Sequence, residues 1–298
     1  MTVSADAGKV RSARSSRREK TWLILASAPK IATAIVLVSI LAAILAPWIV
    51  PHSPIAPDLS NIRLPPFMFE GGSLEYPFGT DWQGRDILSR VIMGTRVSLS
   101  IAALCILIGG LIGSAFGLAA GYAGGWLDML VMRAVDVFLA FPSILLALIF
   151  AVTIGPNFWV VVSVLVFMIW ARYARLVRAE VLTWKERDFV ALARIAGASR
   201  VRIILVHILP NVVGSIVVLS TLQVGWAIMV EASLSFLGAG IPPPTPTWGG
   251  MIADGRNYVD TLWWISVVPG IAVMLVVLSF NIFGDWLRDI LDPKMLRL

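Results

Sequence analysis

Long apolar runs separated by shorter polar segments make up most of this chain. Six runs carry few or no charges, at residues 31–50, 97–122, 129–154, 157–173, 212–237 and 264–283. A helix rises about 1.5 Å per residue, so runs of this length reach across the roughly 30 Å hydrocarbon core of a bilayer. The pattern predicts an all-α polytopic membrane protein with six transmembrane helices.

One charged segment, residues 188–210, departs from this pattern. Asp188 is placed to cap a short helix over residues 189–196, and Gly197 follows as a natural residue to end it. Such a helix is about 12 Å long, too short to cross a bilayer. Its apolar positions share one face, at Phe189, Leu192, Ala193 and Ala196. We predict a short helix at the membrane surface that either docks against a partner or lies on lipid.

A second short piece follows this helix. Ser199 is predicted to cap a new helical start, and an apolar run over residues 203–209 leads back toward the membrane. Pro210 is expected to limit or kink that run, because proline removes a helical hydrogen bond. The same reasoning predicts a kink at Pro142 in the third span.

The second span is rich in glycine, and these residues define a packing face. They are Gly109, Gly110, Gly113, Gly117 and Gly121. Small residues at such spacing let membrane helices approach each other closely. We therefore predict a tight helix contact along this face.

The composition supports the membrane class. The 298 residues are 58% hydrophobic and 14% charged, whereas a soluble domain carries about a quarter charged residues. The single cysteine, Cys105, leaves no disulfide framework and no cysteine metal cluster. The net charge of +6 does not indicate nucleic acid, because the basic residues lie beside the membrane spans.

Basic residues also indicate the orientation. Residues 1–30 carry seven Lys and Arg and residues 172–207 carry eight, whereas the loop 238–263 has only Arg256. Six spans place the leader, the charged segment and the C-terminal tail on one side, which the positive-inside rule assigns to the cytosol. A basic leader also resembles a signal or transit peptide, but the twenty-residue run after it fits a retained helix better.

No catalytic or metal site is predicted. A P-loop needs Gly-Lys followed by Ser or Thr, and no lysine of the chain stands in that pattern. His52 and His207 are the only histidines, and neither lies in a zinc-hydrolase motif. We therefore expect ATP hydrolysis, where it is needed, to come from a partner.

Several polar residues within the spans are candidates for a translocation pathway. Arg133 and Asp136 are one helical turn apart and are predicted to neutralise each other, as a structural pair or beside the pathway. Gln223 in the middle of the fifth span is a second pathway candidate. Glu231, near the outer end of that span, either lines an outer gate or pairs with another subunit.

Two polar loops complete the description. In the first, Asp81 and Asp86 suggest a cation site, but internal salt bridges to Arg85 or Arg90 explain them better. In the last, residues 242–248 are proline-rich and should be stiff and extended. That stretch is either a rigid spacer or a surface that meets another protein.

Residues 197–211, GASRVRIILVHILPN, resemble the second half of the EAA loop of ABC-importer permeases. Gly197 and the pair Leu209–Pro210 stand at the spacing of that loop. The first half departs from it, since Ala191 stands where the acid usually is and Leu192 replaces an alanine, while Ala193 matches. The resemblance implies a coupling helix, hinged at Gly197, that docks through its shape and nearby arginines.

Four further motifs resemble the peptide/nickel permeases, in particular their dipeptide and oligopeptide C-type subunit. They are FGTDWQGRDILSRVIMGTRVSL (78–99), AGYAGGWLDMLVMRAVDVFLAFP (120–142), EASLSFLGAGIPPPTPTWGGMI (231–252) and FNIFGDWLRDILDPKM (280–295). The resemblance implies a type I ABC-importer permease fold with four parts. These are a cytosolic tail (1–30), a first transmembrane helix with an extracytoplasmic loop (31–96), a permease core (97–286) that includes the coupling segment 187–210, and a cytosolic tail (287–298).

The same resemblance implies site residues for ATPase coupling. They are Asp188, Phe189, Ala191, Leu192, Ala193, Arg194, Gly197, Ala198, Ser199, Leu209 and Pro210. The candidate pathway or gate residues stay Asp136, Gln223 and Glu231.

The function implied is that of a permease subunit of an ATP-driven ABC importer in the bacterial inner membrane. Its expected partners are a second permease, two cytosolic ATPase subunits that bind ATP and Mg²⁺, and an extracytoplasmic solute-binding protein. Short peptides are the expected cargo, with nickel chelates, glutathione or sugar-like solutes as alternatives. An ion-coupled secondary transporter is the other class considered, but we find no inverted repeat with paired broken helices.

Overall fold

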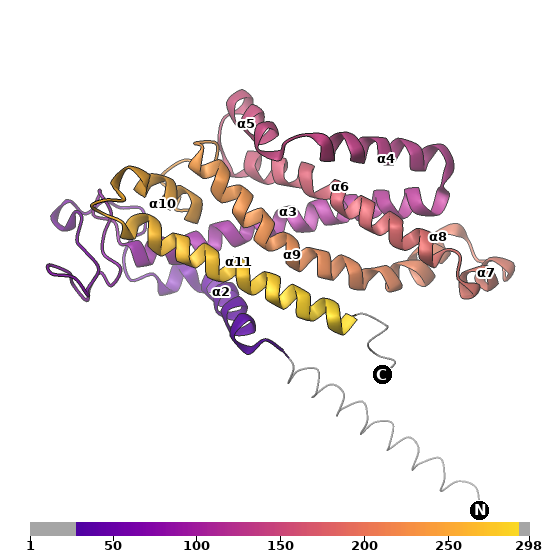
Figure 1. The fold of residues 1–298 in the computed structure, drawn as a ribbon, viewed down its shortest axis with the longest axis horizontal. Coiled ribbons are helices and arrows are strands. Elements are labelled where there is room, and N and C mark those ends of the chain that lie inside the picture. The colour runs from indigo at the N-terminus through magenta and orange to yellow at the C-terminus, as the bar shows by residue number, and fades with distance from the viewer. Residues whose placement is uncertain (1–27, 292–298) are drawn as a thin grey trace, which may run out of the picture.

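The computed structural model describes residues 28–291, and every regular element in that range is a helix. The longer helices lie roughly along the long axis, with α7 and α8 at one end and α10 at the other (Figure 1). The elements are α2 (Lys30–Ile49), the 3₁₀ turn η1 (Leu59–Asn61), α3 (Ile87–Ala123), α4 (Gly125–Ala140), α5 (Ser143–Ile154), α6 (Phe158–Trp184), α7 (Asp188–Ile195), α8 (Arg200–Arg202), the π-helix η2 (Ile203–Ile208), α9 (Leu209–Phe236), α10 (Trp248–Gly255), the 3₁₀ turn η3 (Arg256–Tyr258) and α11 (Trp264–Leu291). The predicted all-α class is confirmed.

Five helices in the described range are long and apolar enough to cross a membrane, and α4 with α5 makes a sixth span if the two are taken together. The axes of α4 and α5 meet at 86°. Phe141 and Pro142 between them are extended, with ψ of 133° and 115°, because the residue before a proline is kept out of the helical region. The predicted kink at Pro142 is therefore a sharp break.

Several helices run beyond the apolar segments that predicted them. α3 begins at Ile87, ten positions before the predicted start at 97, because the Asp86 carboxylate accepts hydrogen bonds from the backbone N–H groups of Leu88 and Ser89. α6 continues to Trp184, past the predicted end at 173, and α11 continues to Leu291. Hydropathy marks where a helix leaves lipid, whereas the helix itself ends at a cap.

The fifth span shows the largest difference from prediction. α8, η2 and α9 form one continuous span from Arg200 to Phe236. Pro210 does not end the helix, because the preceding turns, Ile203–Ile208, widen into a π-helix. A wider turn of this kind accommodates the carbonyl that a proline ring would otherwise meet.

α3 lies at the centre of the bundle and packs against α2, α4, α6 and α9, while α11 packs on α2 and α9. The predicted glycine face of α3 is buried and packs against α6. A Cβ atom added at Gly113 would lie 2.2 Å from the Trp170 carbonyl oxygen, and one at Gly117 would lie 2.7 Å from that of Ala174. The predicted close helix contact is confirmed.

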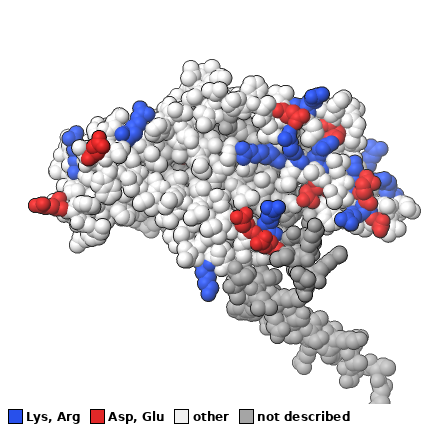
Figure 2. All heavy atoms as spheres, in the orientation of Figure 1, with Lys and Arg blue, Asp and Glu red and all other residues white. Residues whose placement is uncertain are grey.

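Charged side chains gather toward the ends of the molecule. Figure 2 shows most of those on this face at the end that carries α7, with a smaller group at the opposite end and a largely uncharged band between. An apolar belt between two polar ends is the surface expected of a membrane-spanning bundle. The predicted N-terminal tail lies outside the described residues up to position 27, as does the last part of the C-terminal tail from position 292.

Candidate functional site

The α7 helix forms the outermost part of one end of the molecule (Figure 1). Its first residue is Asp188, and Arg187 occupies the N-cap position without a side-chain hydrogen bond. The prediction that Asp188 caps the helix is therefore wrong. Its carboxylate lies in the first turn, where a negative charge is favourable beside the partly positive helix N-terminus.

The C-terminal end of α7 is built as predicted. Gly197 has a φ of +79°, a conformation that residues with a Cβ rarely adopt. Its N–H donates to the Arg194 carbonyl at 3.1 Å, and the Ala198 N–H donates to the Ala193 carbonyl at 3.0 Å. These two bonds form a Schellman motif, which satisfies carbonyls at the helix end.

A second helical start follows the glycine. The Ser199 hydroxyl accepts a hydrogen bond from the Arg202 N–H at 3.3 Å, which confirms that Ser199 is an N-cap. Leu209 and Pro210 then open α9 directly after the π-helix. The segment is thus a short helix, a glycine turn and a long helix.

Val190 anchors α7 to the bundle. It is fully buried in a cluster with residues of α6 and of the fifth span, and Ala193 packs against the same cluster. The other side of the helix is open, with Leu192 65% and Ile195 84% exposed. The predicted apolar face is therefore divided: Ala193 packs on the bundle and the Phe189 ring lies beside Trp184, whereas Leu192 points away and is available for contact with another molecule.

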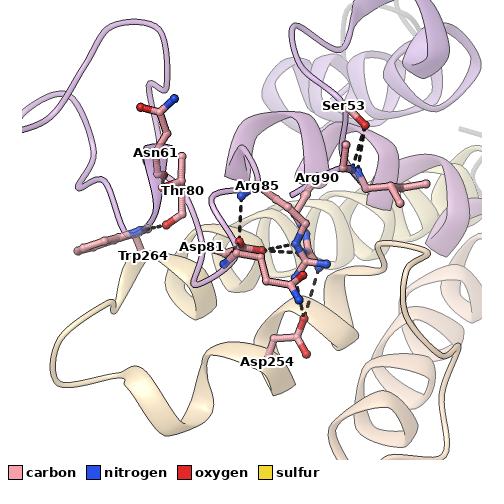
Figure 3. A network of polar contacts seen from close by, with 11 residues as sticks. Ser53, Asn61, Thr80, Asp81, Arg85, Arg90, Asp254 and Trp264 are labelled. Atoms are coloured by element: carbon pink, nitrogen blue, oxygen red, sulfur yellow. Dashed lines mark hydrogen bonds and ion pairs between the residues drawn. The ribbon is translucent and has the colours of Figure 1, made fainter. Parts of the chain in front are cut away.

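The opposite end of the molecule is held by a buried ionic network (Figure 3). Asp81 accepts hydrogen bonds from Arg85 Nε at 2.7 Å and from Arg90 Nη1 at 2.5 Å. Arg90 Nη2 also donates to Asp254 of α10 at 3.4 Å. Among residues 28–291 no cluster of acids, cysteines and histidines suited to a metal is found. The predicted salt bridges to Arg85 and Arg90 are confirmed for Asp81, whereas Asp86 pairs with neither arginine and caps α3 instead.

Asp254 is the member of this network that the sequence did not single out. Burial raises the pKa of its carboxyl above the ordinary value of 3.8, although Arg90 and Arg85 act in the opposite direction. Trp264 completes the junction by donating from its indole N–H to the Thr80 carbonyl at 2.9 Å. The network thus ties the first polar loop and α3 to α10 and α11.

A cavity of about 530 Å³ opens beside this network. Its walls come from α10 and from the proline-rich loop after α9, including Pro243, Thr247 and Asp254. The stretch 242–248 turns at Pro243 and Pro244 and bends at Thr245. Thr247 is extended and caps α10 by accepting from the Gly250 N–H at 2.9 Å, and Trp248 already belongs to that helix. The prediction of an extended stretch is therefore wrong, because consecutive prolines fix φ but leave the chain free to turn.

Asp136 does not pair with Arg133 as predicted. Its carboxylate pairs with Arg175 of α6 instead. One turn closer to the C-terminal end of α6, Arg178 donates from Nη2 to Asp128 of α4 at 2.6 Å. Position i+3 on a helix favours contact between two side chains but does not force it, and a neighbouring helix supplied the better partners. Asp136 thus joins α4 to α6.

Gln223 is buried where α9 faces α6. Its Oε1 accepts a hydrogen bond from Arg172 Nη1 at 3.0 Å, and its Nε2 has no partner within residues 28–291. The Arg172 guanidinium also lies 4.2 Å from the centroid of the Trp226 ring. Arg172 was used in the sequence only to orient the chain, so its place at this site was missed.

Glu231 is fully buried inside the subunit. Its carboxylate accepts hydrogen bonds from the hydroxyls of Ser235, at 2.9 Å, and of Ser98 on α3, at 3.3 Å. These contacts lie within the chain, so the gate role and the pairing with another subunit both stay predictions. Asp136, Gln223 and Glu231 each have separate partners, so the structure does not gather them into one site.

Several known proteins are similar to this chain. The family of binding-protein-dependent transport system inner membrane components matches residues 113–297. The di/tripeptide transport system permease protein DppC of Pseudomonas aeruginosa (strain UCBPP-PA14) is 40% identical over 259 residues, which cover 87% of this chain and 86% of that protein. The probable D,D-dipeptide transport system permease protein DdpC of Escherichia coli (strain K12) is 36% identical over 298 residues, covering 99% and 98% of the two chains.

A third relative is similar to this chain in sequence, and one solved structure is similar to it in fold. The glutathione transport system permease protein GsiD of Escherichia coli O6:K15:H31 (strain 536 / UPEC) is 44% identical over 261 residues, covering 87% of this chain and 84% of that protein. The inward-facing MetNI methionine ABC transporter matches with a TM-score of 0.59 at 17% identity, covering 69% of this chain and 97% of that one. That likeness concerns the fold, and it confirms the predicted type I ABC-importer permease architecture.

Proposed function

The chain belongs to the family of binding-protein-dependent transport system inner membrane components, and we propose that it forms, with a second permease subunit, the membrane pathway of an importer for short peptides. The family places the chain among inner-membrane transport permeases. Support for the peptide cargo comes from relatives at 36–40% identity whose names specify dipeptides or di/tripeptides. Glutathione is the second candidate, because a relative at 44% identity is a glutathione permease.

The observation that carries the coupling role is the uncovered apolar face of α7. Leu192 and Ile195 are largely exposed at the end where charged side chains gather, outside the apolar belt (Figure 2). We infer that this face enters a cleft on a cytosolic ATPase subunit, which binds ATP and Mg²⁺. Ala191 carries no charge, so shape and Arg194 replace the carboxylate usual in EAA loops.

The remaining partners follow from the same proposal. The α7 end faces the cytosol, as do both termini, which agrees with the basic residues on that side. The Asp254 end then faces outward, and the proline-rich loop 242–247 with its adjacent cavity is the surface offered to a solute-binding protein. We expect the nucleotide to bind to the ATPase subunits, because no lysine of this chain stands in a P-loop pattern.

Transport in reconstituted vesicles tests the cargo. The complex of this chain with the second permease and the ATPase subunits is placed in lipid vesicles with ATP on the α7 side and binding protein on the other. We expect a labelled dipeptide to accumulate only when both ATP and binding protein are present. Accumulation of a nickel chelate or a sugar, without peptide, would overturn the proposal.

A paired substitution tests the docking surface. Leu192→Glu should abolish copurification of the ATPase subunits, because a carboxylate in an apolar cleft is left without a partner. Leu74→Glu is the matched control, since Leu74 is also exposed, at 80%, but lies in the loop at the opposite end. Equal recovery of ATPase with both variants would show that α7 does not dock.

A further inference from the structure

Three arginines of α6 follow one another at intervals of three residues. Arg178 pairs with Asp128 and Arg175 pairs with Asp136, both on α4. Arg172 breaks this series: within residues 28–291 its hydrogen-bond partner is the neutral Gln223, and no carboxylate pairs with it. One of three similar charges on the same helix thus has no counter-ion.

Arg172 lies near the end of the apolar part of α6. It is fourteen residues after Phe158, where α6 begins, about 21 Å along the helix, and it is next to the last residue of the apolar run 157–173. Gln223 is thirteen residues before Phe236, where α9 ends, about 20 Å along that helix, and it lies inside the apolar run 212–237. A charge beside apolar spans without a counter-ion is costly, and such residues commonly mark the path of a substrate or ion.

Arg172 and Gln223 together present N–H donors for which the described residues provide too few acceptors. Arg172 donates to Gln223, so the amide must turn its oxygen toward the guanidinium and its nitrogen away. The Gln223 Nε2 then has two N–H groups and no partner, and the guanidinium keeps N–H groups beyond the one used. A carboxylate accepts hydrogen bonds from both groups and matches the planar fork of arginine.

Trp226 adds to this site. It lies three residues after Gln223 on α9, and its ring face covers one side of the Arg172 guanidinium. An aromatic face orients a guanidinium without neutralising it, so the positive charge stays available. Arg172 is partly exposed, whereas Gln223 is only 4% exposed. A ligand therefore meets the arginine first and reaches the amide when α6 and α9 separate.

We propose that Arg172, oriented by Gln223 and Trp226, binds the carboxylate of the transported solute during its passage. This inference rests on the proposed importer function and specifies a chemical feature of its cargo, a free carboxylate. For a short peptide that group is the C-terminal carboxylate. A counter-ion supplied by the second permease is the competing explanation, and the test separates the two.

The test compares two cargoes in the reconstituted complex with saturating binding protein. One is a dipeptide with a free C-terminus, and the other is its C-terminal amide. Arg172→Gln should reduce uptake of the free acid by about ten- to a hundredfold, the effect of losing one charge-assisted hydrogen bond, and leave uptake of the amide unchanged. Arg172→Lys should restore part of the activity, and Arg175→Gln, which removes a paired charge, should affect both cargoes equally.

Each contrary outcome has a distinct meaning. Equal loss for both cargoes with Arg172→Gln, or loss of the second permease on purification, would assign Arg172 a structural or inter-subunit role and overturn the inference. Absence of peptide uptake by the unsubstituted complex would instead overturn the proposed peptide function. Vesicles made only of zwitterionic lipid exclude an anionic lipid headgroup as the ligand, and the discrimination between cargoes should persist in them.

A crosslinking measurement does not depend on acceptance of the amide. A peptide that carries a photoreactive group at its C-terminal residue is delivered to the complex, and the adducts are located by mass spectrometry. We expect adducts on the segments of α6 and α9 around Arg172 and Gln223. Adducts confined to other segments would contradict the assignment.

Discussion

Gly113 should be the glycine of α3 that is least tolerant of an added methyl group. A Cβ atom there would lie 2.2 Å from the Trp170 carbonyl oxygen and 2.7 Å from the Tyr173 Cβ atom. The first of these is about 1 Å short of ordinary van der Waals contact. Both obstacles belong to the backbone or to its first side-chain atom, so no rotamer change relieves them, and α3 and α6 must separate.

Moving two packed helices apart by about 1 Å lowers the free energy of unfolding by about 1–3 kcal/mol. We place Gly113→Ala toward the upper end of that range. Gly110→Ala should cost less, because its Cβ would meet only the ring of Tyr173, at 3.3 Å. Gly270→Ala is the control, since Gly270 lies in α11 with nothing within 4 Å. Alanine there should stabilise slightly, because it is a better helix former than glycine.

The thermal midpoint of the purified permease complex, followed by tryptophan fluorescence, measures this series. A change of 1 kcal/mol corresponds to about 2–4 °C in a chain of comparable size, so Gly113→Ala should lower Tm by several degrees relative to Gly270→Ala. Gly110→Ala should fall between the two. Equal midpoints for all three variants would refute the conclusion that α3 and α6 are held at contact distance by these glycines.

Two further substitutions test the two ends of the molecule. Gly197→Val should leave ATP hydrolysis intact but reduce peptide uptake, because a side chain costs about 1–2 kcal/mol at a positive φ and stiffens the turn after α7. Gly124→Val, at a φ of +66° with equally open surroundings, is the control, and equal uptake by both variants would contradict a hinge at Gly197. Because burial raises the pKa of Asp254 above 3.8, the folded state holds a proton that the unfolded state releases, so stability should fall as pH rises from 3.8 through the folded pKa. Asp254→Asn should flatten that decline in Tm measured from about pH 4 to pH 7, whereas Asp260→Asn, an exposed substitution, should not.

Hydropathy predicted how many segments cross the membrane better than it predicted where the helices end. The first span matches within one residue at each end, because Pro29 and Pro51 flank it directly. The start of α3 was placed ten residues too late, although Asp86 with Ser89 after it is a local capping signal that a search for caps finds. The extension of α6 past residue 173 was missed because arginines there end the apolar run without ending the helix.

The side-chain partners were the least predictable part. Arg133 and Asp136 satisfy the spacing rule for an ion pair, yet Asp136 pairs with Arg175. Which of two arginines a carboxylate meets depends on how α4 lies against α6, and no local pattern contains that information. The regular spacing of arginines along α6 was visible in the sequence, but the lack of a counter-ion at Arg172 became evident only once α4 and α9 were in place.

The fold connects the proposed docking surface to the proposed ligand contact through two helices. Val190 anchors α7 among residues of α6 and of the segment that leads into α9, including Val181 and Ile208. The same two helices hold Arg172 and Gln223. Under the proposed function, a displacement of α7 by a closing ATPase pair would be transmitted through Val190 to α6 and to the segment before α9, and the π-helix between Gly197 and α9 is a turn able to change its hydrogen bonding. Opening of the α6–α9 contact exposes the amide of Gln223. We expect this step to be the one by which ATP binding changes the affinity of Arg172 and Gln223 for the solute carboxylate.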